Sequence, residues 1–493
     1  ELVDDLNRFG PELALLVAGG LIIVFDALIP LADRRLAHNR RNIAAALGML
    51  GVAVSALWTL LLVLTDEQGP AFDGLMVADD YAIFFNFLFA GVAAVIILAS
   101  MDFLERIRFP AEYIALILAS TVGMMLMAST VDLIAIFVAL ELQAISLYVL
   151  VGFQKDARSS EAALKYLLLG AISTALTLYG MAYLFGLSGS THLNDIAAFV
   201  RDADSGARSG LVLAAVFLAA GLGFKMAVVP FQMWVPDVYQ GAPTPVTAYL
   251  SVASKAAGFA VVMRIFVVAL GDGLIASDWS IMFAVIAAIS MTFGNVAALA
   301  QTNIKRMLGY SSVAQAGTFL IGLAAVAAED PQLLLGTSSV VFFLGTYAFT
   351  NLGAFVAIIA ISGKIGSEEI ADYAGMAKRS PWLALGLAAC LLSLTGIPPA
   401  AGFWAKIYVF NAAVEADLVW LAIVGVLNSV VSAYYYLRVV LNMYTQDPAS
   451  EEAFQPSPYL GFALAAAVIG LFAVGLYPDA LLEASESAVA VLG

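Results

Sequence analysis

The sequence predicts an all-α polytopic membrane protein of about fourteen transmembrane helices. Of its 493 residues, 62% are hydrophobic and only 12% are charged, whereas soluble domains carry roughly 25% charged residues. Apolar runs of transmembrane length recur along the whole chain, and about 20 apolar residues in a helix cross a hydrocarbon core of roughly 30 Å. These observations leave no room for a large soluble domain.

The spans are delimited by charges, glycines and prolines at the ends of apolar windows. The predicted spans are 11–31, 42–64, 78–100, 111–128, 131–152, 161–187, 210–235, 244–270, 279–300, 306–327, 332–361, 381–414, 417–442 and 459–478. They divide the chain into an N-terminal three-helix segment (1–110), helices four to eight (111–278), helices nine to thirteen (279–445), and a C-terminal loop with helix fourteen (446–493).

Lys and Arg fall unevenly on the two sides that these spans define. One side receives fourteen of them: Arg34, Arg35, Arg40, Arg41, Arg106, Arg108, Lys155, Arg158, Lys305, Arg306, Lys364, Lys378, Arg379 and Arg438. The other side receives three, namely Arg8, Arg201 and Arg208. Because cytoplasmic loops retain positive charge, the first side is predicted to be cytoplasmic and both termini periplasmic.

Redox centres and metal sites are excluded by the scarcity of the residues that would bind them. Cys390 is the single cysteine, so it supplies neither an internal disulfide nor an iron–sulfur site. The two histidines, His38 and His192, fall between apolar runs and cannot hold a haem inside the membrane. We therefore expect no cofactor and no metal in this chain.

Deep charges inside the predicted spans are the candidate functional residues. A charge at the centre of a membrane helix costs about 2.5–3.5 kcal/mol on insertion scales. Glu141 lies at the middle of its span, roughly 15 Å from either end at 1.5 Å per residue. Lys225, Lys255 and Lys406 are also deep. One carboxylate and one lysine could form a static ion pair, but one carboxylate cannot neutralise three lysines.

Lys165 and Arg264 each allow two interpretations. Lys165 follows Glu161 by four residues at the inner end of its span, so it is either a helix-surface ion-pair partner or part of the deep set. Arg264 lies six residues from the outer end of its span, so its long side chain either reaches the membrane surface or belongs to the deep set.

Prolines interrupt two spans beside deep lysines. Pro230 follows Lys225 in span seven, and Pro398 and Pro399 precede Lys406 in span twelve. Proline donates no backbone hydrogen bond, and the carbonyls it frees are tolerated at membrane depth only against protein or water. We therefore expect a hydrated cavity beside each of these lysines.

The two interruptions lie five spans apart, so their helices cross the membrane in opposite directions. Paired interrupted helices in inverted repeats mark the ion pathway of many transporters. The sequence therefore predicts two inverted five-helix repeats, helices four to eight and nine to thirteen. The carbonyls expected to be free are those of Met226, Leu394 and Thr395.

A long signature around the first interruption is similar to a known family. The run 230–246, Pro-Phe-Gln-Met-Trp-Val-Pro-Asp-Val-Tyr-Gln-Gly-Ala-Pro-Thr-Pro-Val, with Lys225 before it and Lys255 after it, resembles the signature shared by antiporter-like subunits of respiratory complex I, the proton-translocating NADH-quinone oxidoreductase, and by Mrp-type antiporters. Further matching segments are 141–142, 161–166, 305–312 and 396–399. The resemblance covers about residues 80–445.

The resemblance implies a proton pump in a bacterial inner membrane, driven by NADH oxidation and quinone reduction in other subunits. It implies that Glu141 and Lys225 form the charge pair of a first half-channel, that Lys165 and Lys255 continue along the midplane, and that Lys406 serves a second half-channel. NADH, FMN, iron–sulfur clusters and quinone are expected in other subunits. The expected partners are neighbouring antiporter-like and small membrane-arm subunits and lipids, with no nucleic acid.

One departure from the family concerns glutamines. Gln232 and Gln315 stand where relatives often carry histidine, so a step that needs a titrating imidazole is not expected at these positions.

Two other functions compete with the pumping subunit. An Mrp-type sodium/proton antiporter subunit would share the lysines and the interrupted helices, although the 237–243 run argues against it. A scaffold of the membrane arm would make Glu141→Gln and Lys225→Ala alter assembly while leaving pumping per electron intact.

Overall fold

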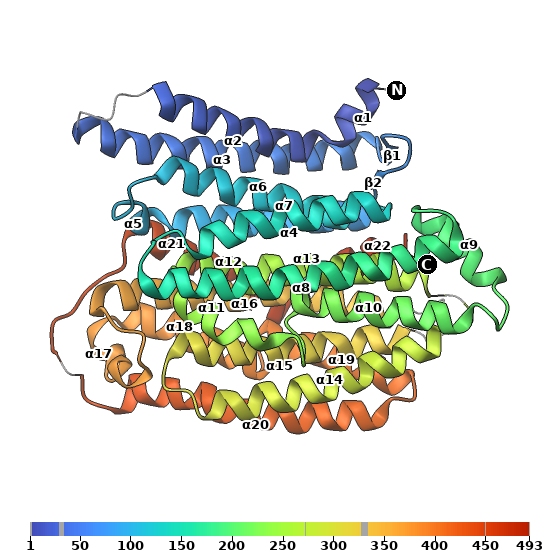
Figure 1. The fold of residues 1–493 in the computed structure, drawn as a ribbon. Coiled ribbons are helices and arrows are strands. Elements are labelled where there is room, and N and C mark those ends of the chain that lie inside the picture. The colour runs from blue at the N-terminus through green and yellow to red at the C-terminus, as the bar shows by residue number, and fades with distance from the viewer. Residues whose placement is uncertain (1, 29–33, 272, 327–333, 449, 493) are drawn as a thin grey trace.

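The protein is a bundle of roughly parallel long helices in a computed structural model that describes residues 2–28, 34–271, 273–326, 334–448 and 450–492 (Figure 1). Within these ranges, 13 helices are long and apolar enough to cross a membrane. The predicted all-α polytopic membrane fold is therefore confirmed. The predicted span 381–414 is made of two shorter helices in succession, Pro381–Thr395 and Ala401–Glu415.

The N-terminal segment lies along one edge of the bundle (Figure 1). Its elements are α1 (Leu2–Arg8), α2 (Gly10–Leu28), α3 (Arg34–Thr65), β1 (Gly69–Ala71), β2 (Met76–Ala78), α4 (Asp80–Ala99) and α5 (Met101–Leu104). The two short strands pair antiparallel. Asp79 caps the start of α4, because its carboxylate accepts a hydrogen bond from the backbone N–H of Ala82.

The middle of the chain contains the first interrupted helix. Its elements are α6 (Pro110–Ser129), α7 (Leu133–Val151), α8 (Ala157–Ser188), α9 (Leu193–Asp202), α10 (Arg208–Met226), η1 (Gln232–Trp234), α11 (Val235–Gly241), α12 (Thr244–Tyr249), η2 (Leu250–Ser254), α13 (Lys255–Met263) and η3 (Arg264–Ala269). The predicted span 210–235 thus ends as a helix at Met226, and Pro230 lies in the connection to η1.

The last part of the chain contains the second interrupted helix. Its elements are α14 (Ala276–Leu299), α15 (Ile304–Ala325), α16 (Leu335–Ile365), η5 (Ile370–Tyr373), α17 (Met376–Arg379), α18 (Pro381–Thr395), α19 (Ala401–Glu415), α20 (Val419–Thr445), α21 (Pro458–Leu476) and α22 (Asp479–Val489). Pro398 and Pro399 lie between α18 and α19.

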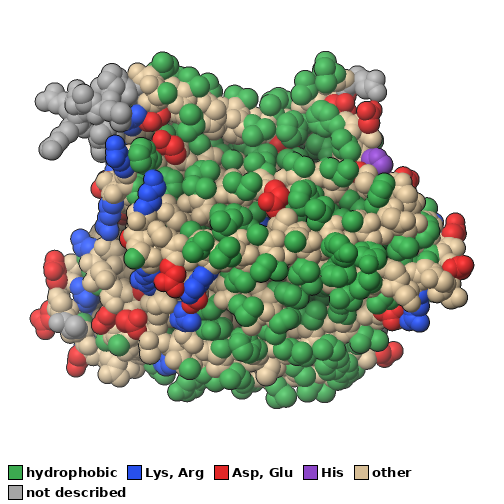
Figure 2. Space-filling view, in the orientation of Figure 1, with side chains coloured by type: hydrophobic (Ala, Val, Ile, Leu, Met, Phe, Trp, Pro, Cys, Tyr) green, Lys and Arg blue, Asp and Glu red, His purple; other side chains and the backbone are tan. Residues whose placement is uncertain are grey.

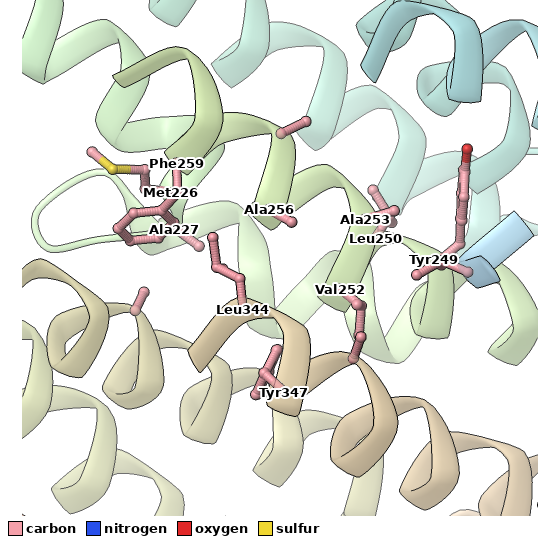
Figure 3. Packing of buried hydrophobic residues seen from close by; sticks show 14 of the residues in the cluster. Met226, Ala227, Tyr249, Leu250, Val252, Ala253, Ala256, Phe259, Leu344 and Tyr347 are labelled. Carbon is pink, nitrogen blue, oxygen red and sulfur yellow. The ribbon is translucent and has the colours of Figure 1, made fainter. Parts of the chain in front are cut away.

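The centre of the bundle is densely apolar. The segment from α12 to α13 and helix α16 are almost wholly buried. Figure 3 shows Val252 pointing from η2 toward α16, and Leu344 of α16 pointing toward Ala227 at the end of α10. A polar group buried in this region is costly unless it is hydrogen-bonded.

On the face drawn in Figure 2, Lys and Arg side chains are concentrated at one end of the bundle, as their uneven division between the two sides in the sequence predicts. The two chain ends lie at the same end of the molecule (Figure 1), and Lys and Arg side chains gather mainly at the opposite end of the face drawn in Figure 2. Between the two ends, that face is largely hydrophobic (Figure 2), as a surface in contact with lipid must be.

Candidate functional site

Glu141 and Lys225 meet at a small cavity but do not form a direct ion pair. The Glu141 carboxylate on α7 accepts a hydrogen bond of 2.7 Å from the Thr174 hydroxyl on α8. A cavity of about 10 Å³ touches both charged side chains, close to the roughly 10–15 Å³ that one water needs. Its other lining residues are Phe137, Leu140, Ser173, Thr177 and Leu222. One water in this cavity would therefore connect the two charges.

Lys225 is held by a glutamine that the sequence did not single out. Its ammonium, buried at the last turn of α10, donates to the side-chain oxygen of Gln143 at 2.6 Å. The amide nitrogen of Gln143 donates in turn to the hydroxyl of Ser254 at 2.7 Å. Because Ser254 directly precedes Lys255, Gln143 links the first deep lysine to the backbone turn that carries the second.

Lys255 lies at the junction of η2 and α13 and is buried. Its ammonium donates to the backbone carbonyl and to the hydroxyl of Ser312 on α15, the latter at 2.5 Å. The hydroxyls of Ser312 and Tyr239 are 3.1 Å apart. Lys255 therefore has neutral partners only, in an apolar region of the bundle.

Helix α15 carries the polar contacts from one half of the molecule to the other. Ser312 contacts Lys255, and the adjacent Ser311 shares a hydrogen bond with the Tyr436 hydroxyl on α20. One turn further along α15, the amide nitrogen of Gln315 lies 3.5 Å from the same tyrosine hydroxyl. Ser312 thus contacts Lys255 from the middle of the chain, and Ser311 contacts Tyr436 from the last part of the chain.

Lys406 is buried beside the second interruption. Its ammonium donates to the Thr395 carbonyl at 2.8 Å, and Gln315 donates to the Leu394 carbonyl at 3.2 Å. These are the two carbonyls that Pro398 and Pro399 were expected to free. Lys406 and Gln315 therefore donate the hydrogen bonds that were expected from water on the basis of the sequence. Because the carbonyls of Thr395 and Leu394 are adjacent, Gln315 lies next to the surroundings of Lys406.

Lys165 lies apart from this series of contacts. It is about two turns from the start of α8, with 43% of its side chain exposed, and it pairs at 2.8 Å with both Glu161 and Asp237. Arg306 pairs with the other oxygen of Asp237. Burial raises the pKa of Asp237, but hydrogen bonds from Lys165 and Arg306 outweigh this effect and hold the pKa below its usual range. The structure thus adds Asp237 to the expected pair with Glu161.

Arg264 is a buried ion-pair partner and does not reach the surface. It is 2% exposed and makes two hydrogen bonds to the Asp79 carboxylate, at 2.7 and 2.8 Å. It also donates to the Ala128 carbonyl and lies over the Tyr81 ring. Sequence reasoning missed this pair because Asp79 is distant in the chain and stands just before its helix. Its contacts join α4, α6 and η3, which indicates a structural role.

The two glutamines at family histidine positions differ in their contacts. The amide nitrogen of Gln315 donates to the Leu394 carbonyl as described, but the side-chain oxygens of both buried glutamines accept no hydrogen bond from a described residue. Gln143, Ser312 and Tyr436 were also missed, because neutral polar residues in an apolar helix carry no charge signal. Within the described ranges, no group of three or more His, Cys, Asp or Glu could hold a metal ion.

The chain is similar in sequence to known membrane proteins. A model of the NADH:quinone oxidoreductase/Mrp antiporter transmembrane family matches residues 128–432. NADH-quinone oxidoreductase subunit N of Dehalococcoides mccartyi is 44% identical over 495 residues, which cover 99% of this chain and 100% of that protein.

Two solved structures show the same fold. A chain of respiratory complex I from Thermus thermophilus with bound aureothin is 30% identical, with a TM-score of 0.79 over 97% of this chain and 99% of that chain. A chain of the Mrp complex from Dietzia sp. DQ12-45-1b is 20% identical, with a TM-score of 0.84 over 100% and 98% of the two chains. At that identity, the second likeness concerns the fold alone.

Proposed function

Because the chain belongs to the NADH:quinone oxidoreductase and Mrp antiporter transmembrane family, we propose that it is a proton-translocating membrane-arm subunit of NADH-quinone oxidoreductase. Relatives that match it over nearly its full length bear the name subunit N of that enzyme. The chain works as part of a translocase whose redox chemistry takes place in other subunits. Its partners are the other membrane-arm subunits of the complex.

A single observation supports the assignment of the proton path: hydrogen-bonded polar side chains lead from one deep lysine toward the next across an otherwise apolar bundle. Gln143 and Ser254 lead from Lys225 to the turn that carries Lys255, and Ser312 accepts a hydrogen bond from Lys255. Buried polar groups without partners are costly, so these paired groups support a role for the core in proton transfer.

The relay that we propose starts at Glu141. A proton passes through a water in the shared cavity to Lys225 and from there to Lys255, while Gln143 and Ser254 hold the Lys225 ammonium in place and line the way between the two lysines. Ser312 and Ser311 carry it across α15. Tyr436 and Gln315, with the neighbouring carbonyls of Leu394 and Thr395, lead to Lys406. Lysine suits this task because its ammonium both donates and, once deprotonated, accepts a proton.

Lys165 enters this proposal as the least connected member. Its partners Glu161 and Asp237 hold it near the start of α8. We therefore assign Lys165 to the entrance of the relay. The helices are interrupted at Pro230 and at Pro398 and Pro399. We propose that these interruptions leave backbone carbonyls free of helical hydrogen bonds beside Lys225 and Lys406.

The proposed surroundings follow from the same assignment. The chain spans a bacterial inner membrane with both termini in the periplasm, and helices four to eight and nine to thirteen form inverted repeats. NADH, FMN, iron–sulfur clusters and quinone are bound by other subunits. The end of the molecule that is rich in Lys and Arg then faces the cytoplasm, which supports this orientation.

The alternative function is an Mrp-type sodium/proton antiporter subunit. The experiment that separates the two uses vesicles containing the complete complex, either supplied with NADH or subjected to a sodium gradient. The proposal expects proton transport driven by NADH oxidation that is lost in Lys225→Ala. Proton transport driven by sodium alone, lost in the same variant, would favour the antiporter. Unchanged pumping per electron with poor assembly would favour a scaffold.

A further inference from the structure

The N-terminal segment contains a buried acid that is separate from the proposed relay. Glu12, near the start of α2, is 1% exposed. The sequence pattern conceals it, because a single carboxylate at the edge of an apolar run looks like the end of a transmembrane span. Helix α2 lies along the edge of the bundle opposite α14 and α20 (Figure 1). Glu12 therefore needs an explanation of its own.

No charged residue with a described contact is a partner of this carboxyl group. Its own backbone N–H and the side chain of Asn86 lie near it, but neither is close enough and well enough aligned to donate a hydrogen bond to its oxygens. Arg8 precedes Glu12 by four residues, the spacing of a helical ion pair, yet its guanidinium donates to the carbonyls of Glu67 and Pro70. An ionised carboxylate left alone in an apolar interior is strongly disfavoured.

The neighbours of Glu12 are polar but uncharged. The side chain of Asn86 on α4 lies beside the carboxyl group. The Asn86 side-chain oxygen is buried and has no hydrogen-bond partner among the described residues. On α3, Trp58 lies against Gly10, two residues before Glu12. An acid that keeps its proton can donate to the Asn86 oxygen, whereas an ionised acid would meet no cation with a described contact there.

Charged groups on the surrounding elements lie elsewhere or are engaged. Those with described contacts are Arg8 on α1, Arg40 and Arg41 on α3 with their partners Asp26 and Glu105, and Asp79 and Asp80 at α4 with their partners Arg264 and Gln68. The other acids on these elements are Asp4 and Asp5 on α1 and Glu112 on α6. The only cations in this set are thus bound by other groups.

We propose that Glu12 is a proton-binding site of the N-terminal segment, which holds a neutral carboxylic acid between α2, α3 and α4. The bound ligand is a proton, and no other reactant is required. This site is distinct from the Glu141 and Lys225 cavity, so it adds a second place where the chain can take up or release a proton. The alternative ligand for a set of oxygens is a monovalent cation such as sodium.

Infrared spectroscopy of the intact complex in membranes tests the proposal. The carbonyl band of protonated carboxyl groups should be weaker in Glu12→Gln than in the wild type at neutral pH, and the lost component should shift in deuterium oxide. Glu12→Asp should move this component without removing it, which decides the question if the glutamine variant fails to assemble. Glu105→Gln is the control, because Glu105 is 59% exposed and pairs with Arg41.

Two results would overturn the proposal. Loss of an ionised carboxylate band in Glu12→Gln, with the protonated band unchanged, would show that Glu12 is charged. A protonated band that appears in the wild type only after sodium is removed would show that the site binds the cation instead.

Discussion

Gln143 provides the sharpest perturbation of the relay, because leucine fills nearly the same space but cannot bridge Lys225 to Ser254. The variant leaves the ammonium without its 2.6 Å acceptor. A hydrogen bond to a charged group is worth about 1.5–3 kcal/mol. Since about 1.4 kcal/mol is a factor of ten in rate, Gln143→Leu should slow proton transfer between Lys225 and Lys255 by roughly ten- to a hundredfold.

The assay compares protons translocated with NADH oxidised in vesicles that contain the complete complex. Asn351→Leu is the matched control. It removes the buried hydrogen bond of 2.7 Å that the Asn351 side-chain amide donates to Ser251, and this bond involves no lysine. We expect the proton-to-electron ratio to fall in Gln143→Leu and to remain unchanged in Asn351→Leu. An unchanged ratio in Gln143→Leu, or an equal fall in both variants, would refute the reasoning.

Three further predictions follow from other contacts. Ser312→Ala, which leaves Lys255 only the backbone carbonyl, should slow pumping roughly tenfold or more in the same vesicles, because a hydrogen bond to a charged group is worth about 1.5–3 kcal/mol; an unchanged rate would contradict this. Arg264→Met should destabilise the protein by up to about 3 kcal/mol, since it leaves the partly buried Asp79 unpaired, and Asp79→Asn added to it should restore part of the thermal stability. Burial raises the pKa of Glu368, but the charge and hydrogen bond of Lys305 outweigh this effect and hold the pKa below its usual range. The ion pair between Glu368 and Lys305 should therefore persist at neutral pH and weaken in acid as the carboxylate is protonated. The protection of the residue 370 amide, which is the intrinsic exchange rate at the same pH divided by the measured rate, should then fall in acid in the wild type but not in Glu368→Gln.

The fold could be predicted well from the sequence because the membrane imposes simple rules. Apolar length gives the spans, and prolines such as Pro230 and Pro398 show where helices end. The deep lysines could be found for the same reason, since each charge stands out against an apolar run.

The contacts of these charges could not be predicted, because they depend on packing between distant helices. Nothing near Lys225 in the sequence indicates that Gln143, on a different helix, is its acceptor. Arg264 was assigned a path to the surface, since the depth of a residue in its own span says nothing about Asp79 on the adjacent α4. Glu12 was missed because only the tertiary structure shows that it is buried without a partner.

The central claim is that Lys225 and Lys406 belong to one continuous relay, and a double-mutant comparison tests it most directly. The protons translocated per NADH oxidised are measured for complexes that carry Lys225→Met, Lys406→Met or both. A single relay predicts that each variant loses the same number of protons and that the double variant loses no more, because residues that act as a unit are non-additive. Losses that add in the double variant would show two independent paths and contradict the account.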